Sequence, residues 1–189
     1  MKRTVTTMSI VVLAGLSIAC GTGNGHSTSD STGNDDKENE DGSAVESGTR
    51  DNPFEPGDTI SLDEWEVTLD KTNPDATDEV LAENQFNSEE LKDATAVMAE
   101  VTATYTGKDS GMAGVDLRLE FVGGDGNTYD ALNASCGVIP EPFMDLGEQY
   151  TDAESTGNVC VALDDTDILD DATWKVTAGM DDTVFVAVK

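Results

Sequence analysis

The feature that most constrains the fold is an alternation of apolar and polar residues with a period of two, which recurs in short segments between residues 52 and 189. In the first of them Trp65, Val67 and Leu69 fall on one side, and polar residues fall on the other. Because successive side chains of a β-strand point to opposite faces, this pattern predicts half-buried strands. Five more segments repeat it, with the apolar series Val97, Ala99, Val101, Ala103 and Tyr105; Leu117, Leu119 and Phe121; Val159, Val161 and Leu163; Trp174, Val176 and Ala178; and Val184, Val186 and Val188.

Turn residues separate these segments and indicate the fold class. Glycines mark the tight connections, at Gly107, Gly111, Gly114 and within residues 123–127. Only residues 75–84 are typical of a short helix, with Asp75 as its N-cap. Many short strands with frequent turns predict an all-β fold with two antiparallel sheets in a sandwich, and a closed barrel is the alternative. Trp65 and Trp174 alternate in step with core positions, so we expect core residues and not an exposed sugar-stacking platform.

The first residues have the organisation of an export signal. Lys2 and Arg3 give a positive start, and the mainly apolar segment 5–18 follows. This segment is shorter than the roughly 20 apolar residues that span a bilayer, and no second hydrophobic segment follows it. Residues 1–19 are therefore predicted to be a lipoprotein signal peptide and not a transmembrane helix.

The end of this segment, Leu16-Ser17-Ile18-Ala19-Cys20, resembles a lipobox, in which a cysteine receives a diacylglyceryl group before the signal is removed. Ser17 stands where a lipobox usually has leucine, and Leu16 lies one position further out. The resemblance implies that Cys20 is lipidated and that the chain is anchored to the outer face of the cytoplasmic membrane, on the extracellular side. Two or more acyl chains, at about 0.8 kcal/mol per buried CH₂, make a durable anchor. Secretion with a free Cys20 is the alternative.

Residues 20–51 are polar and acidic. Between residues 21 and 50 only Ala44 and Val45 are hydrophobic, so burial cannot offset the entropy of ordering this segment. We predict a disordered acidic tether that holds the domain away from the membrane, and we expect its single histidine, His26, to be solvent-exposed.

The chain is strongly acidic beyond the export signal. From residue 20 onward 8 basic residues stand against 39 acidic ones, a net charge of −31. Such a surface repels phosphates, so we predict no nucleic-acid partner.

Cys136 and Cys160 form an even pair once Cys20 is assigned to lipid. In an exported protein an even pair predicts a disulfide, and two buried free thiols are the alternative. A zinc site is disfavoured because residues 52–189 contain no histidine and no second cysteine pair.

Several short motifs, in this order and spacing, resemble the telokin-like or immunoglobulin-like domain family of secreted and lipid-anchored proteins from Gram-positive bacteria. They are Gly48-Thr49-Arg50-Asp51-Asn52-Pro53, Gly57-Asp58, Trp65, Asn84-Gln85-Phe86-Asn87, Tyr105-Thr106-Gly107, Phe121-Val122 and Gly157-Asn158-Val159-Cys160. The resemblance covers most of residues 48–189 and implies an immunoglobulin-like antiparallel β-sandwich with Greek-key-type connections over residues 52–189. The family is largely of unknown function and has no agreed catalytic residues, so none is carried over. The density of aspartate is where this chain departs from it.

The domain lacks the residues that common hydrolases need. Ser-His-Asp and Cys-His mechanisms require a base near the nucleophile, and residues 52–189 contain no histidine. A carboxylate pair could serve a glycosidase, but among the 31 acidic residues of this segment chance proximity is expected. We predict that the domain is not an enzyme, with a carboxylate-dependent hydrolase as the remaining enzymatic alternative.

Aspartates gather in two predicted turns, where their oxygens could bind calcium. One turn holds Asp164, Asp165, Asp167, Asp170 and Asp171, and the other is Asp125-Gly126-Asn127. Neither has the spacing of an EF-hand, so we expect turn residues on an acidic surface and no cofactor other than this possible calcium. Two functions remain open: a binding or interaction module for an extracellular protein or envelope ligand, and a calcium-stabilised structural envelope domain without a small-molecule site.

Overall fold

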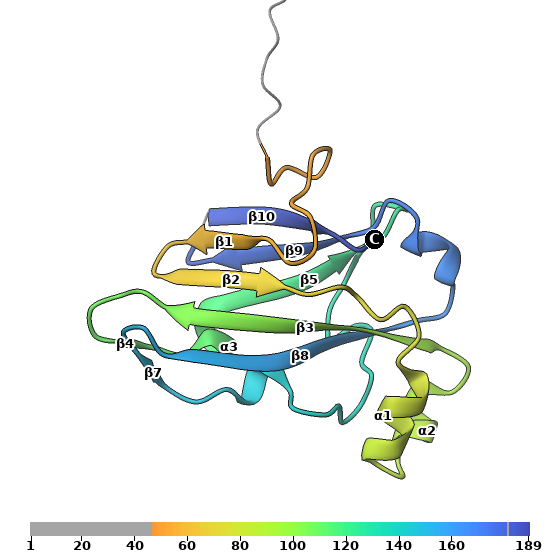
Figure 1. Cartoon of the computed structure of the whole chain (residues 1–189). Helices are drawn as coiled ribbons and strands as arrows, with labels where there is room; N and C mark the ends of the chain where they lie inside the picture. The colour runs from red at the N-terminus through yellow and green to blue at the C-terminus, as the bar shows by residue number, and fades with distance from the viewer. Residues whose placement is uncertain (1–46, 181) are drawn as a thin grey trace, which may run out of the picture. The chain divides into compact units, whose positions relative to one another are not determined.

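The computed structural model describes residues 47–180 and 182–189, which form two facing β-sheets (Figure 1). The strand order is β1-β2-β3-β8 in the first sheet and β10-β9-β5-β6 in the second. Neighbouring strands of both sheets are antiparallel. The predicted all-β antiparallel sandwich is therefore confirmed.

The chain crosses repeatedly from one sheet to the other. The first sheet contains β1 (Thr59–Leu62), β2 (Trp65–Leu69), β3 (Thr95–Tyr105) and β8 (Glu154–Leu163). The second contains β5 (Leu117–Val122), β6 (Thr128–Tyr129), β9 (Thr173–Ala178) and β10 (Asp182–Ala187). A small additional pair joins β4 (Ser110–Gly111) to β7 (Gln149–Tyr150). Strands β3 and β8 are neighbours although they are distant in sequence, as in Greek-key-type connections.

The inward faces of the two sheets share one apolar core. The rings of Phe121 and Trp174 meet edge to face, with their centroids 5.3 Å apart. The Trp174 indole Nε1 donates a hydrogen bond of 2.9 Å to the hydroxyl of buried Thr72, so the buried indole N–H has a partner. Trp65 is also buried, so both tryptophans are core residues, as the alternation predicts.

Short helices occupy the connections. They are α1 (Thr77–Glu83), α2 (Asn87–Leu91) and α3 (Ala113–Asp116), with the 3₁₀ turns η1 (Phe143–Asp145) and η2 (Thr166–Leu169). The predicted helix is confirmed as α1, but its N-cap is Ala76 and not Asp75, and no side chain caps it. Asp75 lies one residue earlier, where its carboxylate accepts a hydrogen bond from the Thr77 N–H. The expectation that no other helix forms was wrong. Helices α2 and α3 are too short to show a helical repeat, and tertiary contacts stabilise them.

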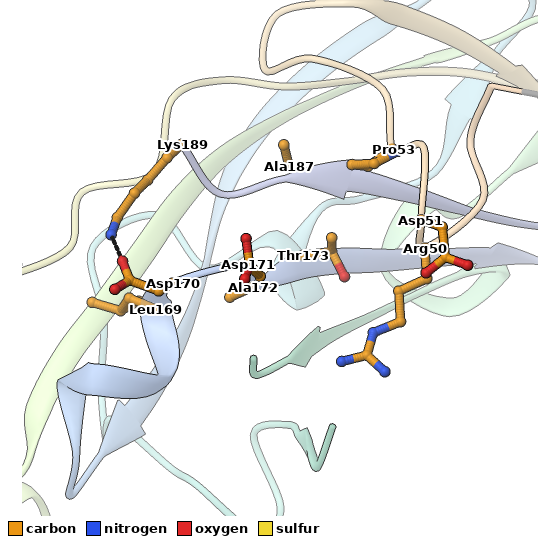
Figure 2. A pocket seen from close by; sticks show the side chains of 10 residues that line it. All are labelled: Arg50, Asp51, Pro53, Leu169, Asp170, Asp171, Ala172, Thr173, Ala187 and Lys189. Atoms are coloured by element: carbon orange, nitrogen blue, oxygen red, sulfur yellow. Dashed lines mark hydrogen bonds and ion pairs between the residues drawn. The ribbon is translucent and has the colours of Figure 1, made fainter. Parts of the chain in front are cut away.

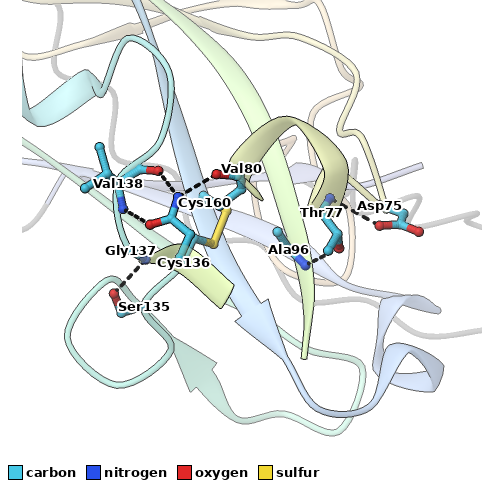
Figure 3. The surroundings of a disulfide bond; sticks show 10 residues. Asp75, Thr77, Val80, Ala96, Ser135, Cys136, Gly137, Val138 and Cys160 are labelled. Carbon is cyan, nitrogen blue, oxygen red and sulfur yellow. Dashed lines mark hydrogen bonds between the residues drawn. A yellow bond between two sulfur atoms is a disulfide. The ribbon is translucent and has the colours of Figure 1, made fainter. Parts of the chain in front are cut away.

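A second, smaller apolar cluster lies on the outer face of the first sheet, beneath α1 and α2. It includes the disulfide between Cys136 and Cys160, whose Cα atoms are 6.1 Å apart (Figure 3). The predicted bridge is therefore confirmed. It ties the long loop between β6 and β7 to strand β8.

The folded part begins before Asn52. The Phe185 N–H donates to the Gly48 carbonyl at 2.9 Å, and Arg50 Nη2 donates to the Gly123 carbonyl at 3.1 Å. The predicted boundary at residue 51 was therefore too late, because backbone pairing that hydropathy does not reveal fixes this segment. The predicted signal peptide, Cys20 and most of the predicted tether lie outside the described residues. None of the helices that are described is long and apolar enough to cross a membrane.

Candidate functional site

The second sheet is incomplete on the side of β8. Strand β8 has ten residues, whereas β6, at the end of the second sheet, has two and pairs only with Phe121 and Val122. The loop between β6 and β7 crosses this open side and touches β8 through the backbone of Ala134 and Glu141. A cleft remains between the two sheets and the loop.

The cleft is concave and mainly apolar, with a volume of about 340 Å³. Inward-facing side chains of both sheets and the apolar side chains of the loop line it, namely Leu119, Val138, Ile139, Pro142, Phe143, Met144, Val159, Val161 and Trp174, together with the Cys136–Cys160 disulfide. The ionisable side chains among its lining residues are Asp130 and Asp145. Apolar hollows of this size with few polar groups are typical of binding sites.

Exposed apolar side chains form the rim of the cleft. Val138 is 48% exposed and Met144 is 68% exposed, and both line it. Helix α3 lies against η1: at Gly114 there is no room for a side chain, because an added Cβ would lie 2.7 Å from the Met144 carbonyl oxygen. The next residue of α3, Val115, is 73% exposed. Exposed apolar side chains beside a hollow are common where a protein binds a partner.

Asn87 fixes the position of the loop at Val138. Its side chain is buried, its Nδ2 donates to the carbonyls of Val80 and Val138, and its Oδ1 accepts from the Val138 N–H at 3.0 Å. The neighbouring Gly137 has φ +78°, and a Cβ there would clash with Asn87 Oδ1, so a larger residue does not fit. The sequence analysis includes Asn87 in a motif but assigns it no role, because the motif does not show which residue it contacts 51 positions away.

A larger but polar hollow of about 900 Å³ lies beside the start of β9 and the end of β10 (Figure 2). Its cationic residues are already engaged: Lys189 Nζ lies 2.6 Å from Asp170 Oδ1, and Arg50 donates to a backbone carbonyl. The hydrogen bond and charge of Lys189 lower the pKa of Asp170. Thr173 lines this hollow, and within the described ranges its buried hydroxyl has no hydrogen-bond partner. Charges of both signs are mixed here, so no single ligand chemistry is favoured.

The aspartates considered for calcium are involved in local contacts. Asp165 Oδ1 accepts from the Asp167 N–H at 2.9 Å and so caps η2, while Asp170 pairs with Lys189. Asp164 and Asp171 are exposed. Within residues 47–180 and 182–189, no group of three histidine, cysteine or acidic side chains could hold a metal ion. Calcium binding at this turn remains a prediction without structural support.

The second aspartate turn is likewise held by its own hydrogen bonds. Asp125 accepts from the Asn127 N–H at 3.0 Å, from Asn127 Nδ2 at 2.7 Å and from the Tyr129 hydroxyl at 3.0 Å. These hydrogen bonds, the one from the Asn127 backbone above all, lower the pKa of Asp125. The turn residues therefore shape the β5–β6 connection.

Comparison with known proteins finds solved structures that share little sequence with this chain. No protein-family profile matches the chain, and no curated protein matches it. A conserved hypothetical protein from Bacillus anthracis has a similar structure, with 10% identity, a TM-score of 0.41 and coverage of 70% of this chain and 94% of that one. An uncharacterised β-sandwich protein from Clostridium difficile 630 shares 12% identity, with a TM-score of 0.40 and coverage of 72% and 94%. A functionally unknown protein from Listeria monocytogenes EGD-e shares 13% identity, with a TM-score of 0.41 and coverage of 62% and 69%. Membership of the telokin-like family is not confirmed.

Proposed function

We propose that this chain is a cell-surface lipoprotein whose acidic sandwich, telokin-like in the order of its motifs, is a non-catalytic binding module for an extracellular protein or another envelope ligand. The observation that carries this proposal is the apolar cleft between the sheets, with Val138 and Met144 exposed at its rim. From residue 52 to residue 189 the domain has 6 basic and 31 acidic residues, a net charge of −25, so its surface is otherwise highly hydrated. An apolar hollow in such a surface favours a partner that covers it.

The chemistry of the cleft supports binding without catalysis. Among the residues that line it, Ser135 has the one hydroxyl, and its Oγ accepts a hydrogen bond from the Gly137 N–H at 3.0 Å. In the part of the chain that the structure describes, no histidine, lysine or arginine lines the cleft to activate this hydroxyl. Asp130 caps the following turn by accepting from the N–H groups of Leu132 and Asn133. This arrangement lacks a nucleophile with an adjacent base.

Display at the outer face of the membrane is supported by the sequence of the N-terminal region. The lipobox-like segment ending at Cys20 and the acidic residues after it would give a lipid anchor and a spacer. The Cys136–Cys160 disulfide suits the oxidising conditions outside the cytosol. Mass spectrometry should find acyl groups on Cys20, and Cys20→Ala should prevent lipidation and leave the precursor unprocessed or misdirected. Wild-type protein found entirely in the medium without lipid would contradict the anchor.

Binding through the cleft is tested by capture from envelope extract with the purified full chain and two methionine variants. Met144→Asp places a charge at the cleft, and Met180→Asp places one at a methionine that is 95% exposed and does not line it. We expect the wild type and Met180→Asp to retain the same envelope protein and Met144→Asp to lose it. Equal capture by all three chains would show that the cleft is not the binding site.

A further inference from the structure

We propose that the cleft binds one apolar residue of a basic segment of the partner protein, whose backbone pairs with Leu119 in β5 and whose side chain enters the space between the sheets. This inference rests on the proposed binding function and specifies the chemistry of the partner. Three features carry it: the backbone of Leu119, the apolar interior of the cleft, and the acidic groups that line it.

Leu119 lies at the open edge of the second sheet. Strand β6 pairs with β5 only at Phe121 and Val122. Beyond β6 the chain turns at Asp130, whose carbonyl accepts a hydrogen bond of 2.8 Å from the Ala134 N–H. Among the described residues no strand therefore lies beside Leu119 on this side, where it lines the cleft and is partly exposed.

The backbone groups of Leu119 point toward this open edge. At the other end of the sheet, the Phe185 N–H in β10 donates to the Gly48 carbonyl, on the side away from β9. Successive residues of an antiparallel strand bond on alternate sides, so Val184 bonds to its partner Val176 in β9. Val176 then bonds away from β5, and Leu119, which lies opposite Val176, bonds away from β9.

The turn between β5 and β6 indicates the same direction independently. The Gly123 N–H donates to the Asn127 carbonyl at 3.0 Å, and Leu119, four residues earlier, bonds on the same side. Within residues 47–180 and 182–189, neither the N–H nor the C=O of Leu119 has a hydrogen-bond partner on that side. A sheet-edge residue of this kind can pair with one residue of another protein.

The loop between β6 and β7 is held on the opposite strand. It bonds to the backbone of β8 at Asn158 and Ala162, and the disulfide links it to Cys160 between them. Leu119 and this loop line the same hollow of about 340 Å³. The hollow therefore leaves room beside β5, although the loop covers the edge of β8.

The interior of the cleft suits an apolar side chain. Paired residues of neighbouring strands direct their side chains to the same face of the sheet. The Leu119 side chain packs against the core, so the side chain of a residue paired with it would also point between the sheets. Phe143 and Trp174, each 1% exposed, line the cleft there. An aromatic or branched aliphatic side chain would contact apolar atoms of both.

The charge of the cleft favours cationic residues beside this apolar one. Asp145 is exposed, and its carboxylate forms no hydrogen bond or ion pair with the residues that the structure describes. Asp130 has only a distant cation, with Arg118 Nη2 at 3.8 Å. Lysine or arginine in the partner would pair with these carboxylates, while an acidic segment would be repelled by them and by the net charge of the domain.

The test uses a peptide with blocked ends, one central phenylalanine, a glycine on each side of it and two lysines at each end. Calorimetric titration into the purified full chain should give saturable binding. Replacing the lysines by glutamate, replacing the phenylalanine by alanine, or methylating the phenylalanine backbone nitrogen should each weaken binding at least tenfold. Methylating the nitrogen of a terminal lysine is the control and should leave the affinity unchanged.

Two measurements on the protein locate the site. Asp145→Lys should weaken binding of the peptide at least tenfold, whereas Asp109→Lys should not, since Asp109 is exposed, does not line the cleft and gives the same change in net charge. Hydrogen exchange of the Leu119 amide should slow at least tenfold in the complex.

The outcomes separate this inference from the function on which it rests. Absence of saturable binding, equal affinity for the lysine and glutamate peptides, equal effects of the two methylations, equal effects of Asp145→Lys and Asp109→Lys, or an unchanged exchange rate at Leu119 would overturn the inference. If capture of the envelope protein still depended on Met144, the binding function would stand with a different ligand. If neither experiment depended on the cleft, both proposals would fail.

Discussion

The two open sides of the sandwich are closed in different ways. On the side of β10, the segment before β1 lies along the strand, with bonds of 2.9 Å from the Phe54 N–H to the Phe185 carbonyl and of 2.8 Å from the Ala187 N–H to the Phe54 carbonyl. On the side of β8, the loop bonds to the backbone of the strand at Asn158 and Ala162, and it is also held by the disulfide at Cys160 and by Asn87. The first closure pairs backbone with backbone, and the second leaves a cleft.

This difference shows how a sandwich can keep a binding surface at its edge without a free strand. An edge strand whose backbone is already paired cannot bind a strand of another protein. A loop held at a few points covers the edge against aggregation and still leaves a cleft between the loop and the two sheets. Changes to the disulfide or to Asn87 should therefore weaken the loop on the β8 side alone. Changes at Gly48 should weaken the segment paired with β10 alone.

Loss of the disulfide should have the largest effect. The double change Cys136→Ser and Cys160→Ser removes a link between residues 24 apart and should lower the free energy of unfolding by on the order of 3 kcal/mol. Urea unfolding measures this change. Hydrogen exchange should accelerate in residues 134–142 more than in residues 48–54. Equal acceleration on both sides would remove the proposed distinction between the closures.

Asn87→Ala should have the next largest effect. The change leaves the backbone groups of Val138 and the Val80 carbonyl without their buried partner and should lower the free energy of unfolding by about 1–3 kcal/mol. The control is Asn84→Ala, which removes one exposed hydrogen bond from the Phe86 N–H. Equal urea midpoints for the two variants would show that Asn87 does not hold the loop.

Gly48→Ala tests the other side. Gly48 has φ +89°, and its new Cβ would lie 2.6 Å from the Phe54 ring, so strain of about 1–2 kcal/mol is combined with a clash. Gly57→Ala is the matched control, since Gly57 has φ +92° with nothing within 4 Å of an added Cβ. We expect Gly48→Ala to be less stable than Gly57→Ala and to bind at the cleft as the wild type does. A loss of binding would mean that the two sides are coupled.

The smallest effect concerns acid and Asp125. Since the folded-state pKa of Asp125 lies below its ordinary value, the unfolded chain takes up the proton first. Its stabilising contribution is therefore complete above about pH 4 and is lost as the pH falls through the folded-state pKa. Asp125→Asn should have a lower free energy of unfolding than the wild type at pH 7, and the difference between the two should be smaller at pH 3. Urea unfolding at both pH values checks this, and Asp93→Asn, which removes no hydrogen bond within the described segments, should show no such pattern.

The sequence predicts the sheets well because each strand carries its own signal. The alternation around Trp65 and Trp174 depends only on neighbouring residues, and the Cys136–Cys160 pair follows from counting cysteines outside the cytosol. The cleft could not be predicted in this way. It depends on where β6 ends relative to β8, on the disulfide that holds the loop, and on a hydrogen bond between Asn87 and Val138. Each of these is a relation between distant segments, which periodicity does not contain.

The attachment of the N-terminal segment along β10 has a mechanical consequence. Strands β1 and β10 lie at one end of the two sheets, and β8 and β6 lie at the other. If the chain is tethered at Cys20, tension on the anchor would reach the domain at Gly48 and Phe54 and would load their hydrogen bonds to β10 first. The disulfide and the loop over the cleft lie at the opposite end of the sheets, so they would carry little of that load. A partner held in the cleft would then remain bound while the anchor side stretched.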